Sequence, residues 1–347
     1  MNKFIKIYIL FTLILTLLTV GFVFFYKDSD LRLKNPVVSK NKDIRRITSI
    51  DTMKYSRDIA REKLNDSSFD EVIEKQVSDI SATNATHIAI GTPYDDEFLP
   101  FLRRWVAKAR KYKLNVWFRG NLSGWEEWFN YPGIGRDEHT AGIVRFIENN
   151  KDLFEDGDIF VTCNECENGG PGDPRRSGDI SGHREFLIRE YKEAKKAFGK
   201  IGKKVAANFN SMNGDVARLI MDKETTKALG GIVVVDHYVK MPEVLANDLK
   251  SLARKSEGLI VLGEFGAPIP DIHGNMGMQE QADWINEAMG RIFQMPEVIG
   301  LNYWVNTGGS TSLWSESGEK RLGVDVVANY FSKNKKIPPR NFIFSPI

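Results

Sequence analysis

The chain has 347 residues, 42% of them hydrophobic and 27% charged, which is the ordinary composition of a globular protein with a sizeable core. Lys and Arg number 48 against 46 Asp and Glu, so the formal net charge is only +2. A balance this even, without a long basic run, argues against nucleic acid as a partner. The length suits one large domain or two ordinary ones.

The N-terminal segment differs in kind from the rest of the chain. From Ile7 to Tyr26 it runs twenty residues without a charge, after Lys3 and Lys6. Such a run matches the apolar thickness of a bilayer, and lysines on its N-terminal side place that end in the cytoplasm. We predict an uncleaved signal anchor over residues 1–26 and a polar linker over 27–44, which hold the rest of the chain outside the cell membrane. A cleaved signal and a secreted protein are the alternative, although the bulky end of the run offers no small-x-small cleavage site.

From residue 45 onward, short apolar stretches rich in Val and Ile alternate with charged segments of helical period. The predicted strands are residues 45–51, 86–92, 115–121, 158–165, 204–210, 230–238, 259–266 and 298–304. The predicted helices are residues 68–83, 97–113, 183–202, 243–255 and 278–293.

Eight strands alternating with helices predict a (β/α)8 TIM barrel that occupies residues 45–347. The strands lack a clean apolar–polar alternation, as expected for parallel strands covered on both faces. An open doubly wound sheet is the alternative. No Gly-x-Gly-x-x-Gly follows the first strand, which argues against dinucleotide binding.

Two carboxylates stand out at the ends of predicted strands, where such barrels carry their chemistry. Glu165 ends the fourth strand and Glu264 the seventh, three βα units further along the chain. This spacing places them across the barrel mouth, where they point at a shared space. Two facing carboxylates are what glycoside hydrolysis needs, one protonated and one ionised. We therefore predict a glycosidase with a carbohydrate substrate and with neither cofactor nor metal.

Neighbouring residues suit those roles. Asn164 is placed to hydrogen-bond a sugar 2-hydroxyl, Tyr238 and Arg119 to hold Glu264 ionised, and Trp304 to form the floor of a sugar subsite. Adjacent strand residues point opposite ways, so one of His237 and Tyr238 is expected to face the pocket unless the strand has already ended. The predicted carbohydrate-binding residues are Arg119, Asn121, Trp125, Asn164, Asn208, His237, Tyr238, Tyr303 and Trp304.

These motifs resemble the clan A glycoside hydrolases, in the style of the cellulase-type barrels of family 5. That clan has an Asn-Glu pair ending strand 4, a Glu ending strand 7, a His-x-Tyr or similar pair after strand 6, and a Trp ending strand 8. The matching residues here are Asn164-Glu165, Glu264 in "LGEFG", His237-Tyr238 and Trp304. The resemblance implies that Glu165 is the acid/base, that Glu264 is the nucleophile, and that the mechanism is retaining and metal-free.

The sequence departs from family 5 at three places. Family 5 enzymes have an Arg from an early strand beside the nucleophile; the second strand here has none, and Arg119 on the third strand is the inferred substitute. Many have a His at the end of strand 3, where this chain reads Arg-Gly-Asn. His237 and Tyr238 are adjacent rather than spaced. The substrate therefore stays open among glucan, mannan, galactan and other glycans, as does endo or exo action.

Other readings of the same residues remain open. Cys163 and Cys166, the only two cysteines, form either a disulfide or two small buried thiols, and they lack partners for a metal site. Glu167 competes with Glu165 as the acid, and the loop with Asp173 and Asp179 is a weak calcium candidate. A barrel that binds glycan without cleaving it and a metal-dependent hydrolase are the alternative functions. No two of the five histidines form a short ligand motif.

Overall fold

The computed structural model of the protein describes residues 45–337. The predicted anchor at 1–26 and the linker at 27–44 lie outside the described residues. Within 45–337, every helix is too short or too polar to cross a bilayer.

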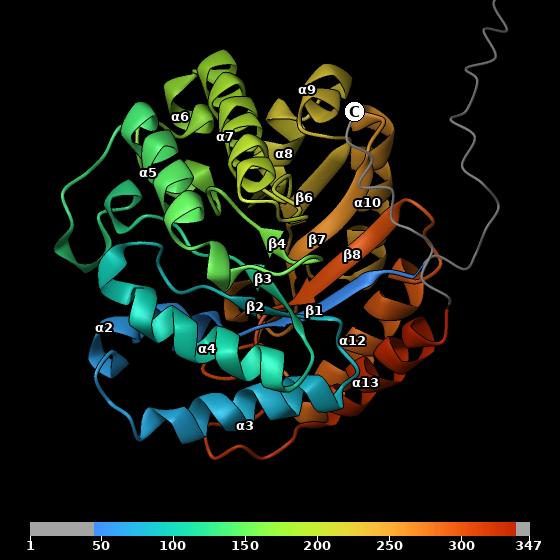
Figure 1. Cartoon of the computed structure of the whole chain (residues 1–347). Helices are drawn as coiled ribbons and strands as arrows, with labels where there is room; N and C mark the ends of the chain where they lie inside the picture. Colours follow the sequence, from blue (N-terminus) through green and yellow to red (C-terminus); the bar gives the residue numbers. More distant parts are fainter. Residues whose placement is uncertain (1–44, 338–347) are drawn as a thin grey trace, which may run out of the picture. The chain divides into compact units, whose positions relative to one another are not determined.

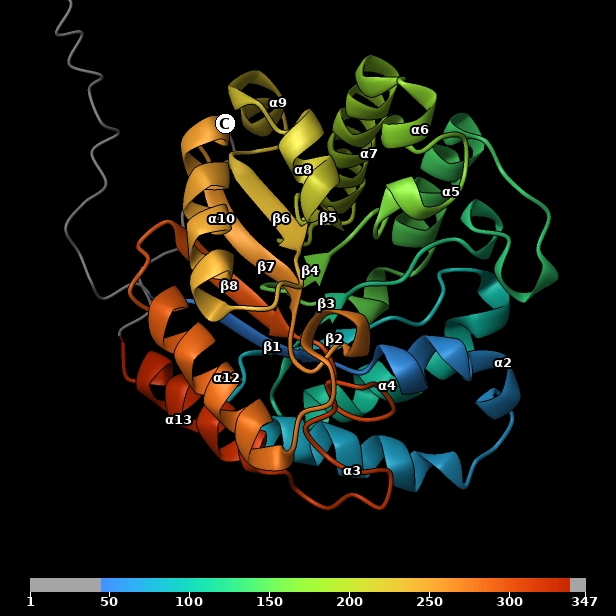
Figure 2. The same ribbon diagram turned by 180° about the vertical axis from the view of Figure 1, so that it is seen from behind.

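The described residues form a ring of eight parallel strands (Figures 1 and 2). The strands are β1 Ile47–Asp51, β2 His87–Ile90, β3 Asn115–Phe118, β4 Ile159–Phe160, β5 Ser211–Asn213, β6 Ile232–Asp236, β7 Leu259–Phe265 and β8 Val298–Tyr303. Their spatial order is β4-β3-β2-β1-β8-β7-β6-β5, so the first and last strands pair, as they do in a closed barrel.

The ring closes between β4 and the residues just before β5. The Ala206 N–H donates to the Asp158 carbonyl (2.9 Å), and the Phe160 N–H donates to the Ala206 carbonyl (2.8 Å). These bonds complete a TIM-like (β/α)8 fold and argue against the open doubly wound sheet.

The fourth and fifth strands are shorter than predicted. Regular pairing in β4 stops at Phe160, because the Thr162 N–H and hydroxyl both donate to the Asn210 side-chain oxygen (3.2 and 2.8 Å) instead of to a backbone carbonyl. The stretch 204–210 pairs with β4 around Ala206, and the regular part of the fifth strand begins only at Ser211. A side chain that replaces a backbone hydrogen bond between strands cannot be recognised from the pattern of apolar residues.

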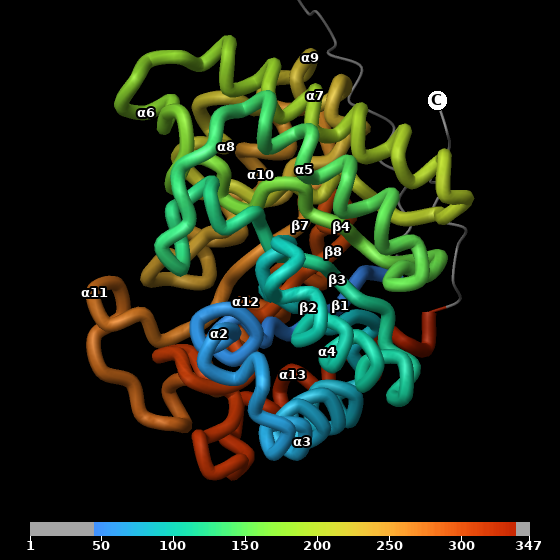
Figure 3. Tube along the Cα trace, turned by 60° about the vertical axis from the view of Figure 1, so that its left-hand side comes forward, coloured from blue at the N-terminus to red at the C-terminus, as the bar shows by residue number. Residues whose placement is uncertain are grey.

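Helices surround the ring, and the tube in Figure 3 follows them around it. They are α2 Ala60–Lys63, α3 Phe69–Ala82, α4 Leu99–Lys111, α5 Arg136–Asn149, α6 Pro174–Ser177, α7 Ile180–Lys200, α8 Gly214–Ile220, α9 Lys223–Ala228, α10 Pro242–Ser256, α11 Pro270–His273, α12 Met278–Ile292 and α13 Leu322–Lys335. The helices that the sequence did not predict are α2, α5, α6, α8, α9, α11 and α13. The last of these lies beside α3, where Asn84 donates to the Ser332 hydroxyl (2.9 Å).

The core has two layers. A large outer cluster packs between strands and helices. A smaller inner cluster fills the barrel and takes side chains from every strand except β5, whose place is taken by the stretch 204–210: Ile47, Ala89, Trp117, Ile159, Val161, Ala206, Phe209, Val234, Val261 and Ile299. Inward-facing residues recur every second position, so Asp51, Arg119 and Asp236 lie above this cluster at the barrel mouth. The filled interior thus forms the floor of the site.

One hydrogen-bonded pair fastens the C-terminal helix to the start of β1. The buried Asn334 accepts from the Arg46 N–H (2.7 Å) and donates to the Arg46 carbonyl (2.9 Å). We predict that Asn334→Ala lowers the free energy of unfolding by about 2–4 kcal/mol, because two buried backbone groups lose their partners. Asn329→Ala, at an exposed position of the same helix, is the control and changes stability by less than about 0.5 kcal/mol in urea unfolding. Equal losses in the two variants would contradict this account.

Candidate active site

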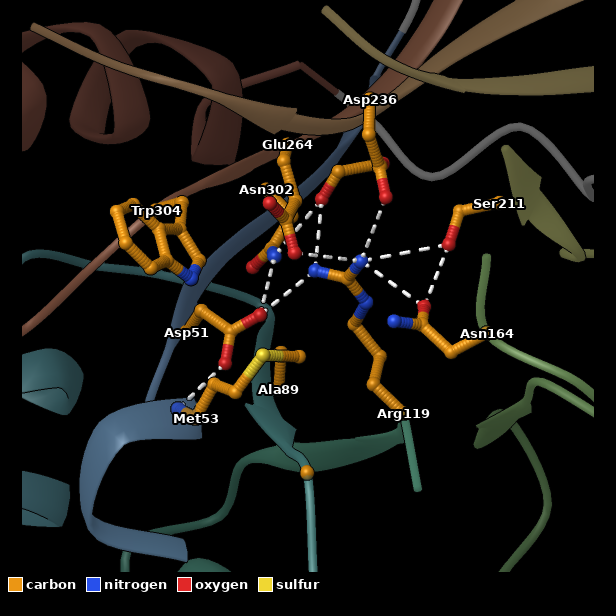
Figure 4. Close-up of polar contacts among 12 residues, drawn as sticks. Asp51, Met53, Ala89, Arg119, Asn164, Ser211, Asp236, Glu264, Asn302 and Trp304 are labelled. Carbon is orange, nitrogen blue, oxygen red and sulfur yellow. Dashed lines mark hydrogen bonds and ion pairs between the residues drawn. The ribbon is translucent and has the colours of Figure 1, made fainter. Parts of the chain in front are cut away.

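Arg119 lies at the centre of the barrel mouth, where it is only 1% exposed (Figure 4). It stands two residues beyond Trp117 and therefore points to the same inner side. Its Nη1 lies 2.6 Å from the Asp51 Oδ2, and its Nη2 lies 3.0 Å from the Glu264 Oε1 and 3.1 Å from the Asp236 Oδ2. The guanidinium also donates to the Gly263 carbonyl, to Asn164 and to Ser211. One side chain thereby joins β1, β5, β6, β7 and the chain beyond β4.

A single cation faces three buried carboxylates in this cluster. Asp51 has further donors, because it accepts from the Met53 N–H (2.7 Å) and from the Asn302 amide (3.1 Å). Asp236 has only Arg119, and its Oδ1 is buried without a partner in the described part of the chain. Burial raises the pKa of Asp236 well above its usual range, although Arg119 opposes the shift. Asp236 therefore holds a proton at neutral pH more readily than an ordinary Asp.

Glu264 reaches the mouth through an irregularity in β7. Val235 pairs with Leu262 but the next residue, Asp236, pairs with Glu264, so Gly263 is an extra residue in the strand. A Cβ at Gly263 would lie 2.2 Å from the Asp236 Oδ1, which explains the glycine. Its carbonyl accepts from Arg119 (3.0 Å) and Asn302 (2.9 Å). The bulge is thus held by the same polar cluster that binds the Glu264 carboxylate.

Two donors bind the Glu264 carboxylate. Arg119 lies 3.0 Å from its Oε1, and the Tyr238 hydroxyl donates to its Oε2 at 2.8 Å. Burial raises the pKa of Glu264 to about 7; the charges of Glu165 and Asp51 push the same way, while Arg119 and Tyr238 oppose them. Because both donors favour the ionised form, Glu264 titrates near neutrality despite its burial.

Glu165 lies beyond the end of β4 in a left-handed backbone conformation (φ 45°, ψ 53°). Its N–H donates to the Ser211 carbonyl at 3.0 Å. Burial raises the pKa of its carboxyl group, and the charge of Glu167 adds to the shift, whereas Arg119 and Arg57 oppose it. Glu165 also raises the pKa of Glu264, so the two carboxyl groups act on each other electrostatically. The mouth therefore holds one carboxyl group bound by Arg119 and Tyr238 and a second, Glu165, whose hydrogen bond comes from the Asn168 side chain.

Asn164, Tyr238 and Trp304 lie around these carboxyl groups. The Asn164 side-chain oxygen accepts from Arg119 (3.0 Å) and from the Ser211 hydroxyl (2.5 Å). Its amide nitrogen has no hydrogen-bond partner within residues 45–337 and stays available to a ligand. The half-buried Trp304 meets the Tyr238 ring edge-on, with 6.2 Å between centroids. The structure thus brings together Arg119, Asn164, Glu165, Tyr238, Glu264 and Trp304.

Two residues that the sequence places at the substrate site are packed inside the helix layer instead. Trp125 is 2% exposed and stacks on Phe186 of α7, with 5.0 Å between centroids. The Asn121 side-chain oxygen hydrogen-bonds the His139 Nε2 (2.7 Å), behind the chain that carries Glu165. The rim loop folds back on the barrel, so its aromatic residue joins the core rather than the surface. Both side chains are buried, and the substrate contacts predicted for this pair stay predictions.

Three further predicted residues have contacts elsewhere in the barrel. His237 turns outward to the Asp248 Oδ2 of α10 (2.8 Å), while its neighbour Tyr238 faces the mouth. The Tyr303 hydroxyl is buried and donates to the Thr311 carbonyl (2.9 Å). The Asn208 amide lies beside Gly230, where an added Cβ would meet it at 2.8 Å. These side chains have partners within the barrel, and substrate contact by any of them stays a prediction.

Sequence reasoning left four residues of the cluster out of the site: Asp51, Ser211, Asp236 and Asn302. Asp51 and Asp236 occur at strand ends on the inward parity, which is the signal that identifies them. Asn302 lies three residues beyond Ile299 of the inner cluster, so parity does not identify it. Ser211 carries no such signal, because the fifth strand begins later than its apolar pattern indicates.

The remaining acidic candidates already have structural roles. The Glu167 Oε1 accepts from the Asn213 N–H (2.5 Å) and amide (3.0 Å), so Glu167 anchors the end of β5. Asp173 and Asp179, considered as calcium ligands, pair with Arg175 and Arg136. Within residues 45–337, no group of three or more His, Cys, Asp and Glu side chains has the arrangement of a metal site.

The fold matches solved glycoside hydrolases. A GH5_18 protein from Streptomyces cattleya in complex with GlcNAc superposes with a TM-score of 0.65 at 13% identity, covering 85% of this chain and 82% of that one. An exo-β-1,4-mannosidase from an Opitutaceae bacterium gives 0.62 at 9% identity, covering 85% and 61%. A β-glucuronidase from Ruminococcus gnavus gives 0.53 at 12% identity, covering 75% and 45%.

This chain therefore has the TIM-barrel fold of these glycoside hydrolases. It spans less than half the length of the glucuronidases that it matches. No family model matches the sequence, and no curated protein resembles it closely enough to match. At 9–13% identity the likeness is one of fold, so the activity has to be argued from the site.

The charge balance around Arg119 gives a prediction about stability. Arg119→Met leaves buried carboxylates without their cation, so the free energy of unfolding at pH 8 falls by about 3–5 kcal/mol. Arg119 lowers the pKa of Glu264 and of Asp236, so both pKa values rise further in the variant. The deficit shrinks as the pH falls through those values, because protonation removes the unpaired charges.

Arg103→Met is the matched control, since Arg103 forms an exposed ion pair with Asp152. Its effect is at most about 1 kcal/mol. Unfolding of both variants in guanidinium chloride at pH 5 and pH 8 measures the difference between their free energies of unfolding. A loss for Arg119→Met that does not depend on pH would contradict the electrostatic account.

Proposed function

We propose that the protein is a retaining glycoside hydrolase that acts on β-linked glycans. One observation carries the proposal: Glu264 is bound by Arg119 and Tyr238 at the mouth of the barrel, while Glu165, which affects its pKa, lies outside these two contacts and has a pKa that burial and Glu167 raise. A pair in which one carboxyl group is held ionised and the other keeps its proton is what double displacement at an anomeric carbon requires. The β-linkage is supported by the structural neighbours, which are a β-glucuronidase and an exo-β-1,4-mannosidase.

In the first step, the ionised Glu264 carboxylate attacks the anomeric carbon. The bond to the leaving oxygen breaks as Glu165 donates its proton to that oxygen. Arg119 and Tyr238 stabilise the Glu264 carboxylate before attack, and the raised pKa of Glu165 favours the proton that it must donate. The product is a glycosyl ester of Glu264 and a free alcohol.

In the second step, the Glu165 carboxylate accepts a proton from water, which attacks the anomeric carbon. The ester bond breaks, the sugar leaves with its original anomeric configuration, and Glu264 returns to its ionised form. The free amide nitrogen of Asn164 serves as donor to the sugar 2-hydroxyl, and Trp304 lies where a ring face would stack.

We further propose that the enzyme works outside the cell, held by the apolar segment at residues 7–26. A disulfide between Cys163 and Cys166 supports this placement, because such bonds persist in oxidising compartments. Protease treatment of intact cells tests it. Loss of the barrel without lysis is expected, and full protection would exclude an outward-facing domain.

The first activity prediction separates the two glutamates. Glu264→Gln lowers kcat on β-glycosides by at least about 10³-fold, because no nucleophile remains. Glu165→Gln lowers kcat/KM on alkyl glycosides by about 10²- to 10⁴-fold but spares dinitrophenyl glycosides, whose leaving group needs no proton. Glu138→Gln, exposed on α5, is the control and leaves the rates unchanged. Wild-type-like hydrolysis by both active-site variants would contradict the assignment of the two glutamates. No hydrolysis by the wild-type protein, with glycan binding retained in all variants, would favour a barrel that only binds glycans.

The second activity prediction concerns pH. The Tyr238 hydroxyl lowers the pKa of Glu264, so Tyr238→Phe raises that pKa. The acid limb of kcat/KM, which follows ionisation of the nucleophile, then moves to higher pH by up to about one unit. Tyr131→Phe is the control, because its hydroxyl donates to Glu97 on the rim (2.8 Å). An unchanged acid limb in Tyr238→Phe would show that Glu264 does not set it.

A further inference from the structure

A buried disulfide brackets Asn164 and Glu165. Cys163 and Cys166 are bonded to each other and are 0% and 1% exposed. The bond closes a short loop whose two inner residues are the proposed sugar contact and the proposed acid/base. A disulfide this local removes little chain entropy from the unfolded state, so its stabilising effect on the whole fold is small. Its position therefore points to a local role.

That local role concerns the backbone of Glu165. Glu165 is a non-glycine residue in the left-handed region, a conformation that is unfavourable and persists only where the surroundings hold it. Here the Glu165 N–H donates to the Ser211 carbonyl (3.0 Å), and the Asn168 N–H donates to the Glu165 carbonyl (2.8 Å). The disulfide between Cys163 and Cys166 further restricts the backbone conformation of Glu165, which lies between them.

A rigid layer lies behind the disulfide. The Trp125 Nε1 donates to the Cys166 carbonyl at 3.1 Å, and the Asn121 amide contacts the Cys163 Sγ at 3.7 Å. Trp125 is itself held by the Phe186 stack and by the edge of His139, with 4.8 Å between ring centroids. The rim residues that do not reach the substrate thus support the loop that does.

We propose that the Cys163–Cys166 disulfide, backed by Trp125, positions the Glu165 carboxyl group for proton transfer. Cys163, Cys166 and Trp125 are positioning residues, since they act through Glu165 and touch no reacting atom. The proposal rests on the proposed function of Glu165. It predicts a selective defect: without the disulfide, proton donation to the leaving group suffers while attack by Glu264 does not.

The test compares leaving groups in the full-length protein. In Cys163→Ala/Cys166→Ala, kcat/KM for alkyl β-glycosides falls by about 10- to 100-fold, the cost of a misplaced catalytic group. For dinitrophenyl glycosides of the same sugar, kcat/KM changes by less than about 3-fold. The loss is expected in kcat and not in KM, and only on the alkyl glycosides, whose leaving group needs a proton. This is a weaker form of the behaviour expected of Glu165→Gln. Equal losses on both substrates, or none on either, would overturn the proposal.

Two further measurements keep the test decisive. If the double cysteine variant does not fold, Trp125→Phe, which keeps the disulfide and removes the bond to the Cys166 carbonyl, takes its place. The same selective loss is expected, and a uniform loss would refute the proposal. Glu165→Gln is measured in parallel. If it shows no leaving-group dependence, the proposed function fails; if it does and the disulfide variant does not, only the positioning role fails.

Discussion

The buried guanidinium of Arg119 is the interaction on which the mouth of the barrel depends. It contacts three carboxyl groups, an amide, a hydroxyl and a main-chain carbonyl, which come from strands far apart in sequence. Burying one cation among several carboxylates is costly, and the contacts offset that cost only while the cluster is complete. The same Arg119 contacts therefore position the carboxyl groups of the site and join the strands at the mouth of the barrel.

The same cluster distributes protons unequally among chemically similar groups. Glu264 has two donors, and Asp236 has one. Burial raises the pKa of Asp236 and of Glu264, and the number of donors decides how far each group resists. Glu165, further from the guanidinium contacts and beside Glu167, is suited to keep its proton. Acid and nucleophile are thus distinguished by surroundings and not by residue type.

The sequence predicted the parts of this account that depend on periodicity. Alternating apolar and amphipathic segments identified the barrel, and strand-end position brought Arg119, Tyr238 and Trp304 to the region of Glu264. Parity also indicated that only one of His237 and Tyr238 faces the mouth, and the outward turn of His237 to α10 agrees with that.

Other features depend on contacts that leave no trace in a linear pattern. A Trp in a loop, such as Trp125, reads the same in the sequence whether the loop extends into solvent or folds onto the barrel. Its burial follows from its packing against Phe186, which the sequence does not reveal. The Asn210 side chain takes the place of a backbone hydrogen bond between the fourth and fifth strands, and regular pairing of the fifth strand begins only at Ser211. The sequence pattern therefore did not identify Ser211 as a residue of the site. The sequence alone is compatible with a disulfide and with two buried thiols at Cys163 and Cys166, and the structure has the disulfide.

The most direct test of the central claim is covalent trapping of the nucleophile. Activated 2-deoxy-2-fluoro β-glycosides of gluco, manno and galacto configuration slow the second step and allow the glycosyl ester to accumulate. Peptide mass spectrometry then locates the label. The account predicts one glycosyl group per chain, on the peptide that contains Glu264, and no label in Glu264→Gln. Hydrolysis of a matching β-glycoside with inverted product configuration and an unlabelled Glu264 would contradict it.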